Sequence, residues 1–234
     1  VHLRMPPGFQ HDCCAIWCTS SQYGLRISPR LFHEHATTLF RELGFRVCPS
    51  DHCLYPRPAD GVLVGIHVDD CVITAPTRDA IRKFKDELRS RDVSFTDDRD
   101  LSDILGIEIE HGRDHSIRIG QRTYIDNMVA TFGFEKLPPS ATPWVKRRNP
   151  PTALPKAAGS TLQLLGKLTW IAMQTRPDIA WAVNQCAQMS ANPARADEMW
   201  ERMTRVVAFL KSTRDQRITY VAGDNGDWPA LALE

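Results

Sequence analysis

The sequence predicts an α+β fold, in which an antiparallel sheet with helices on one face is followed by a helical module. Three runs that predict strands, separated by turn residues as in hairpins, lie at 53–55, 62–74 and 105–119. Amphipathic helical patterns alternate with these runs at 29–43, 77–90 and 124–133. After a proline-rich stretch, helical patterns alone occupy 160–212.

The composition is that of an ordinary globular protein. The chain has 234 residues, of which 42% are hydrophobic and 24% charged, enough for a real core. Its formal net charge is only +1, so no overall basic field indicates nucleic-acid binding, although a local basic groove remains open. No apolar run approaches the ~18 residues of a membrane span, and the N-terminus carries no signal peptide. We therefore expect an intracellular protein that is not secreted and has no membrane partner.

The cysteines number seven, an odd count that favours reduced thiols over a disulfide framework. A zinc site built from Cys13, Cys18, Cys48 and Cys53 is an alternative. Neither pair has the two-residue separation of common zinc sites, so packing explains these cysteines better.

The helix expected at 29–43 has favourable residues at both ends. Ser28 is a good N-cap ahead of a proline, and Gly44 fits a left-handed cap. Arg26 and Arg30 flank the helix start, where exposed N–H groups and positive charge favour a phosphate. A capped surface helix with two solvated arginines is the alternative.

Residues 62–74 place two carboxylates, Asp69 and Asp70, inside an otherwise apolar, β-branched run. Such a run predicts strand on both sides, so the chain must turn near this pair or carry two charges into a buried sheet. Adjacent carboxylates repel each other unless a cation lies nearby, and Mg²⁺ prefers oxygen ligands of this kind. Two interpretations stay open from these residues alone: a two-metal site, or a polar hairpin tip with two solvated acids.

The next segments follow local signals. Thr77 is the expected cap of an amphipathic helix that ends at Ser90, and its basic face is expected to be solvated. Residues 105–110 alternate with period two, turn at 112–114 and return as a second strand. The helix after this hairpin ends at Gly133.

Six prolines between 135 and 158 break any regular element, so this stretch is expected to be a linker or a long surface loop. Three helices are expected beyond it, at 160–174, 177–189 and 197–212. A short strand and an irregular tail are expected at 217–234.

Several segments, in chain order, resemble the reverse transcriptase of copia-type LTR retrotransposons, and the matches cover nearly the whole chain. The matching motifs are Met5-Pro6-Pro7-Gly8-Phe9, Tyr23-Gly24-Leu25-Arg26 with Ser28-Pro29-Arg30, Ser50-Asp51 with Cys53-Leu54-Tyr55, His67-Val68-Asp69-Asp70, Leu105-Gly106-Ile107-Glu108-Ile109 and Thr175-Arg176-Pro177-Asp178-Ile179-Ala180. Each motif is weak alone, but six in register favour the metal site over the polar hairpin tip.

The resemblance implies a partial polymerase palm at 1–134, the linker at 135–158 and a helical thumb or connection module at 159–216. Residues 217–234 would lead toward an RNase H domain. The implied reaction is RNA-directed DNA synthesis, in which a primer 3′-hydroxyl attacks the α-phosphate of a dNTP across two Mg²⁺ ions.

The same resemblance assigns residues and partners. Asp69 and Asp70 would be the catalytic and metal-binding carboxylates, with Asp69 the direct ligand, because successive strand side chains point to opposite faces. The residues expected near the dNTP and the template are Tyr23, Gly24, Arg26, Ser28 and His67. Leu105 and Gly106 would support the primer end. The implied partners are an RNA or DNA template-primer, a dNTP and neighbouring segments of a Pol polyprotein, in the cytoplasm or in virus-like particles.

The chain also departs from the family pattern. The family's first catalytic aspartate and its fingers precede the motif at Met5, so we expect a truncated domain with impaired activity. His67 stands where the family has tyrosine, and Ile27 where it has glutamine. No acidic set of an RNase H domain can be placed at 224–228. The alternative function is a non-catalytic relic that binds nucleic acid or protein.

Overall fold

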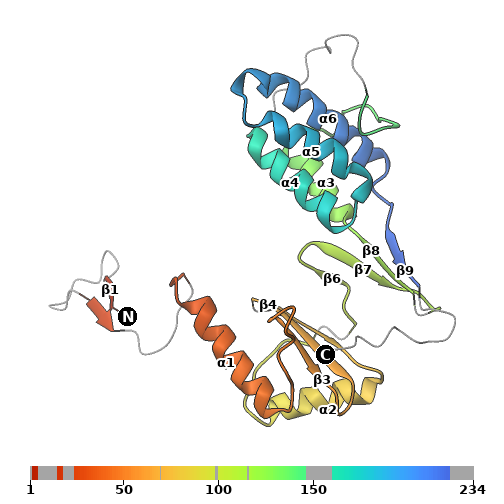
Figure 1. The fold of residues 1–234 in the computed structure, drawn as a ribbon. Coiled ribbons are helices and arrows are strands. Elements are labelled where there is room, and N and C mark those ends of the chain that lie inside the picture. The colour runs from red at the N-terminus through yellow and green to blue at the C-terminus, as the bar shows by residue number, and fades with distance from the viewer. Residues whose placement is uncertain are drawn as a thin grey trace. The chain divides into compact units, whose positions relative to one another are not determined.

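The computed structural model describes residues 2–4, 15–17, 24–68, 70–97, 100–114, 116–145 and 160–221. The chain forms two compact units, an N-terminal and a C-terminal unit, which divide between Asp97 and Asp98 (Figure 1). Both units combine helices with antiparallel strands, so the predicted α+β class is confirmed. Among the described residues, no helix is long and apolar enough to cross a membrane.

The N-terminal unit contains a three-stranded antiparallel sheet and two helices. The strands, in the order β3-β4-β5, are Leu54–Arg57, Val62–His67 and Asp70–Thr74. The helices are α1 (Ser28–Glu42) and α2 (Arg78–Arg89). A separate antiparallel pair consists of β1 (His2–Arg4) and β2 (Ala15–Trp17).

The buried side chains of the β3-β4-β5 sheet lie on one face. Tyr55 lies opposite Val64 in the strand register, and Val62 is two positions along from Val64, so all three point the same way. They form one core with Phe40 of α1 and Phe84 of α2. The two helices therefore cover the same face of the sheet, as the sequence predicted.

Local signals fix the ends of these helices. The predicted N-cap of α1 is wrong by one residue: Ile27 occupies that position without a side-chain cap, and Ser28 is already helical. The reason is that the Ser28 N–H donates to the Leu25 carbonyl at 3.0 Å, so the chain is wound before Ser28. Gly44, with a φ of 85°, ends α1 as predicted. Thr77 caps α2 as predicted, accepting the N–H of the third helical residue at 3.2 Å.

The C-terminal unit combines a four-stranded antiparallel sheet with a helical bundle (Figure 1). The strands, in the order β6-β7-β8-β9, are Asp103–Ile104, Ile107–His111, Ile117–Gly120 and Ile218–Tyr220. The helices are α3 (Arg122–Thr131), α4 (Thr161–Gln174), α5 (Ala180–Met189) and α6 (Ala196–Ser212), with short 3-10 helices η1 (Pro177–Ile179) and η2 (Pro193–Arg195). The helices predicted beyond the proline-rich stretch are confirmed.

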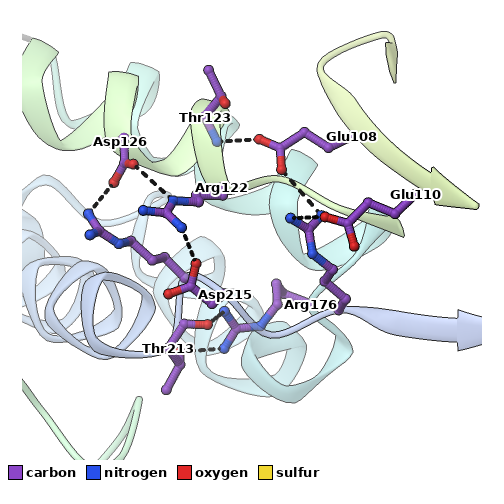
Figure 2. Close-up of polar contacts among 10 residues, drawn as sticks. Glu108, Glu110, Arg122, Thr123, Asp126, Arg176, Thr213 and Asp215 are labelled. Carbon is purple, nitrogen blue, oxygen red and sulfur yellow. Dashed lines mark hydrogen bonds and ion pairs between the residues drawn. The ribbon is translucent and has the colours of Figure 1, made fainter. Parts of the chain in front are cut away.

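A buried arginine joins helices of the C-terminal unit. Arg176 is 2% exposed and donates to both carboxylate oxygens of Asp178, at 2.9 and 2.7 Å. It also donates to the carbonyl and the hydroxyl of Thr213, at 2.9 and 2.7 Å (Figure 2). Because Arg176 precedes η1 and Thr213 follows α6, this contact ties the start of α5 to the end of α6. The Thr-Arg-Pro-Asp motif thus has a structural role.

The stretch predicted as a linker is described from 135 to 145, and this part lies along α6. The Ser140 N–H donates to the Ala208 carbonyl at 3.4 Å, and Lys211 donates to the Leu137 carbonyl at 3.1 Å. Residues 146–159 lie outside the described part. The domain boundaries that the resemblance implies, at 134 and 158, stay a prediction.

Candidate active site

The β4–β5 hairpin carries the Asp69–Asp70 pair at a tight turn. His67 and Asp70 are the last paired residues of the two strands, so only Val68 and Asp69 connect them. The turn predicted at this pair is confirmed. It also keeps the Asp70 charge out of the buried sheet, because His67, Val68 and Asp70 are all exposed.

Val68 has an uncommon backbone conformation. Its φ is 55°, which is the left-handed region that β-branched residues rarely adopt. The side chain is 63% exposed, so little packing compensates for the strain. Strain of this kind costs about 1–3 kcal/mol and is concentrated at functional sites. The turn therefore carries backbone strain at Val68, which a hairpin tip without a function does not require.

Of the two carboxylates predicted to bind metal, the structure describes Asp70. Asp69 lies outside the described residues, so its predicted role as the direct ligand stays a prediction. Within the described part, no group of three or more His, Cys, Asp or Glu side chains could hold a metal. A pair of carboxylates still fits Mg²⁺, which keeps several waters and is often held by one or two carboxylates together with substrate phosphates.

Two of the four cysteines of the alternative zinc site, Cys48 and Cys53, lie in the described part of the chain. Cys48 is buried and lies 3.3 Å from the Ser50 hydroxyl, whereas Cys53 is exposed. Cys13 and Cys18 lie outside the described residues, so this alternative stays untested.

The residues expected near a nucleotide lie at the start of α1. Gly24 has a φ of 90°, and among the described residues, its chain neighbours aside, no atom lies within 4 Å of the position that a Cβ would take, so on this side its backbone is open to a ligand. Arg26 is exposed, Ser28 is the first residue of α1, and Tyr23 lies outside the described residues. In the part that the structure describes, no hydrogen bond or ion pair joins Arg26 to Asp70. Their proximity to a nucleotide stays a prediction.

The β6–β7 hairpin has a second two-residue turn, made by Leu105 and Gly106. Their φ angles are 55° and 75°, and Ile104 pairs with Ile107 across the turn. The prediction that a strand begins at Leu105 is therefore wrong for two residues, because Gly106 permits the left-handed geometry that a two-residue hairpin requires. That this hairpin supports a primer stays a prediction.

Glu108 of β7 fixes this hairpin to α3. Its carboxylate accepts the Thr123 N–H at 2.6 Å and lies 3.3 Å from Arg217, which also contacts Glu110 at 3.0 Å (Figure 2). The carboxylate thereby caps α3, whose own N-cap residue, Gln121, makes no side-chain cap. Burial alone would raise the pKa of Glu108, but hydrogen bonds from Thr123 and the charge of Arg217 outweigh it and lower the pKa.

Sequence reasoning missed the role of Glu108 and Arg217. Glu108 belongs to a motif that matches the family, and period-two alternation places it on the same face as Glu110. Arg217 is 109 residues farther along the chain, so no local pattern links the two.

The family model described as "Reverse transcriptase (RNA-dependent DNA polymerase)" matches residues 1–146, more than half of the chain. The chain belongs to the reverse transcriptase family. The predicted resemblance is thus confirmed, and the hairpin of Asp69–Asp70 lies inside the matched region.

Relatives of this reverse transcriptase domain come from retrotransposons. The transposon Ty5-1 protein YCL074W of Saccharomyces cerevisiae is 26% identical over 95% of this chain and 74% of its own length. The Retrovirus-related Pol polyprotein from transposon TNT 1-94 of Nicotiana tabacum is 24% identical over 96% of this chain, and that from transposon RE2 of Arabidopsis thaliana is 28% identical over 96%. The chain spans only 18% and 16% of these two polyproteins. No solved structure matches the chain.

Proposed function

We propose that this reverse transcriptase domain catalyses RNA-directed DNA synthesis, adding dNTPs to the 3′ end of a primer. One observation carries the proposal: in the β4–β5 hairpin, the strained, exposed Val68 immediately precedes the Asp69–Asp70 pair. A hairpin without a function would be more stable with a turn residue that tolerates a positive φ.

Asp69 and Asp70 are the residues that would hold Mg²⁺, with Asp69 as the direct ligand and Asp70 more peripheral. When bound at such a site, Mg²⁺ activates an attacking oxygen and neutralises charge on the leaving phosphate. The two carboxylates supply the oxygen ligands, and the short turn limits where these side chains can lie.

The reaction forms one bond and breaks another. The primer 3′-oxygen bonds to the α-phosphorus of the dNTP, the bond from that phosphorus to the β-phosphate oxygen breaks, and pyrophosphate leaves while the hydroxyl proton passes to solvent. The chain contributes mainly by orienting the reactants, since orientation supplies a large part of the rate in such transfers.

Other residues would hold the substrates. The Arg26 cation suits the triphosphate, the open backbone of Gly24 permits close approach, and Leu105 with Gly106 would support the primer end. Ser28, Tyr23 and His67 would complete the nucleotide and template surroundings.

We also propose that the domain works within a longer Pol polyprotein. In the described part of its sheet, β5 is an edge strand, so its outer backbone groups can pair with a strand from a neighbouring segment. Such a strand could bring a third carboxylate beside Asp70 and complete a two-metal site.

Primer extension on an RNA template with Mg²⁺ tests the proposal. The chain is compared with Asp69→Asn, Asp70→Asn and a control, Asp79→Asn, which changes an exposed acid paired with Arg82 on α2. We expect Asp69→Asn to lower extension on the order of 100-fold or more, Asp70→Asn to lower it less, and the control to leave it unchanged.

Two results would contradict the proposal. Equal extension by the chain and by Asp69→Asn would exclude this carboxylate from the site. No extension by a folded chain that still binds the template-primer, both alone and joined to its neighbouring polyprotein segments, would exclude catalysis and favour the non-catalytic, nucleic-acid-binding alternative.

A further inference from the structure

The tip of the β6–β7 hairpin lies against one aromatic ring. A Cβ built on Gly106 would lie 3.3 Å from Cδ2 of Tyr124, on the first turn of α3. Leu105, the other turn residue, is exposed. Tyr124 thus packs against the tip at Gly106, whereas Leu105 faces solvent.

A lysine from another helix lies over the same ring. Nζ of Lys167, on α4, is 5.1 Å from the centroid of the Tyr124 ring. Among the described residues, no carboxylate forms an ion pair with Lys167. A cation over an aromatic face is held in place by the ring electrons and keeps its charge available, unlike a lysine neutralised by a carboxylate.

Several other cations of this unit have such a partner. Arg122 and Arg214 both contact Asp126, and Arg217 contacts Glu108 (Figure 2). Beside the hairpin tip, Lys167 is therefore a positioned charge without a neutralising acid in the described part of the chain.

We propose that Lys167 binds a backbone phosphate of the primer strand, with Tyr124 setting the position of both the lysine and the hairpin tip. The inference rests on the proposed function, because it takes the Leu105–Gly106 turn as the primer support. A lysine that contacts a phosphate raises affinity without reading the base sequence, as a polymerase that copies any template requires.

The salt dependence of template-primer binding tests this role. Fluorescence anisotropy of a labelled DNA primer on an RNA template, without dNTP, gives the Kd between about 50 and 200 mM salt. We expect Lys167→Ala to weaken binding about 3- to 10-fold and to reduce the slope of log Kd against log salt by roughly 0.7–0.9, the loss of one phosphate contact. Lys167→Arg should restore both quantities.

Variants at two further positions test the specificity of this role, and thermal unfolding tests stability. Lys136→Ala removes an exposed lysine of the same unit and should leave the slope unchanged. Tyr124→Phe keeps the ring and should bind normally, whereas Tyr124→Leu should lose affinity as Lys167→Ala does. Thermal unfolding of every variant shows whether the fold is retained.

The outcomes distinguish this inference from the proposed function. An unchanged slope in Lys167→Ala, with tight binding by the parent chain, overturns only the role of Lys167. A higher KM for dNTP in Lys167→Ala, with an unchanged Kd for the template-primer, assigns Lys167 to the triphosphate. That result also overturns the proposed primer contact. A parent chain that does not bind the template-primer at all overturns the proposed function as well.

Discussion

The β4–β5 and β6–β7 hairpins have turns of the same length but are built differently. The β6–β7 turn pairs Leu105 with a glycine, and Tyr124 packs against it. The β4–β5 turn has no glycine, and its first residue, Val68, is β-branched and exposed. Both Leu105 and Val68 have a φ of 55°.

The difference separates a supported turn from a strained one. In the C-terminal unit Leu105 shares the left-handed geometry with Gly106, which adopts it without strain, and the hairpin is fixed to α3 by Glu108. In the N-terminal unit the same geometry is forced on a valine next to two carboxylates. Strain without compensating packing is more typical of a functional site than of a connection.

The largest effect is expected at Gly106. Gly106→Ala should lower the free energy of unfolding by about 2 kcal/mol, because alanine is strained at a positive φ and its Cβ would press on Tyr124. Gly133→Ala is the matched control: its φ is 69°, and no atom of the described residues other than its chain neighbours lies within 4 Å of the added Cβ. It should cost only about 1 kcal/mol. Urea denaturation of both variants measures the difference, and equal losses would show that Tyr124 yields and does not support the tip.

A smaller effect is expected from the cap that fixes this hairpin. Glu108→Gln keeps an acceptor for the Thr123 N–H but removes the charge that faces Arg217 and the start of α3. We expect a loss of about 1 kcal/mol in the free energy of unfolding at neutral pH. Glu110→Gln, at a more exposed acid of the same strand, is the control and should cost less.

The pH dependence of Glu108→Gln has a defined sign. Because the folded state lowers the pKa of Glu108 below its usual value of 4.5, its stabilisation is complete above that pH and is lost as the pH falls through the lower, folded pKa. The parent chain and Glu108→Gln should therefore converge in stability on acidification below pH 4.5. A constant difference between pH 7 and strongly acidic conditions would count against the carboxylate as the cap.

Local patterns predicted most of the fold. Thr77 and Gly44 were identified as helix ends because capping depends on a few neighbouring residues. The turn at Leu105 and Gly106 was missed because the period-two alternation of 105–110 continues through it. Period-two alternation shows which side chains share a face of a strand. It does not show where the backbone turns, so a hairpin turn at Leu105 and Gly106 leaves the alternation of 105–110 unchanged.

Less of the candidate site than of the fold could be predicted from local patterns. Two adjacent acids in a β-branched run indicated the turn at Asp69, and the resemblance supplied the reaction. The strain at Val68 could not be predicted, because it depends on how many residues the strand register leaves for the turn. The contact of Lys167 with Tyr124 could not be predicted either, because it joins two helices and no local sequence pattern links them.

The smallest expected effect is at the other turn, and it has the opposite sign. Val68→Gly removes the strain of a β-branched residue at a positive φ but adds backbone entropy to the unfolded chain. We expect a net gain of about 0.5 kcal/mol in the free energy of unfolding. Leu105→Gly, at the same φ, is the control for relief of strain away from the two acids.

Activity decides what the strain at Val68 does. If it holds Asp69 and Asp70 in the geometry that the reaction needs, Val68→Gly lowers primer extension although the protein is more stable. Asp92→Gly, at a φ of 58° outside both turns, is the activity control and should leave extension unchanged. A Val68→Gly variant that is both more stable and fully active would show that the valine is tolerated by this hairpin and not used by the site.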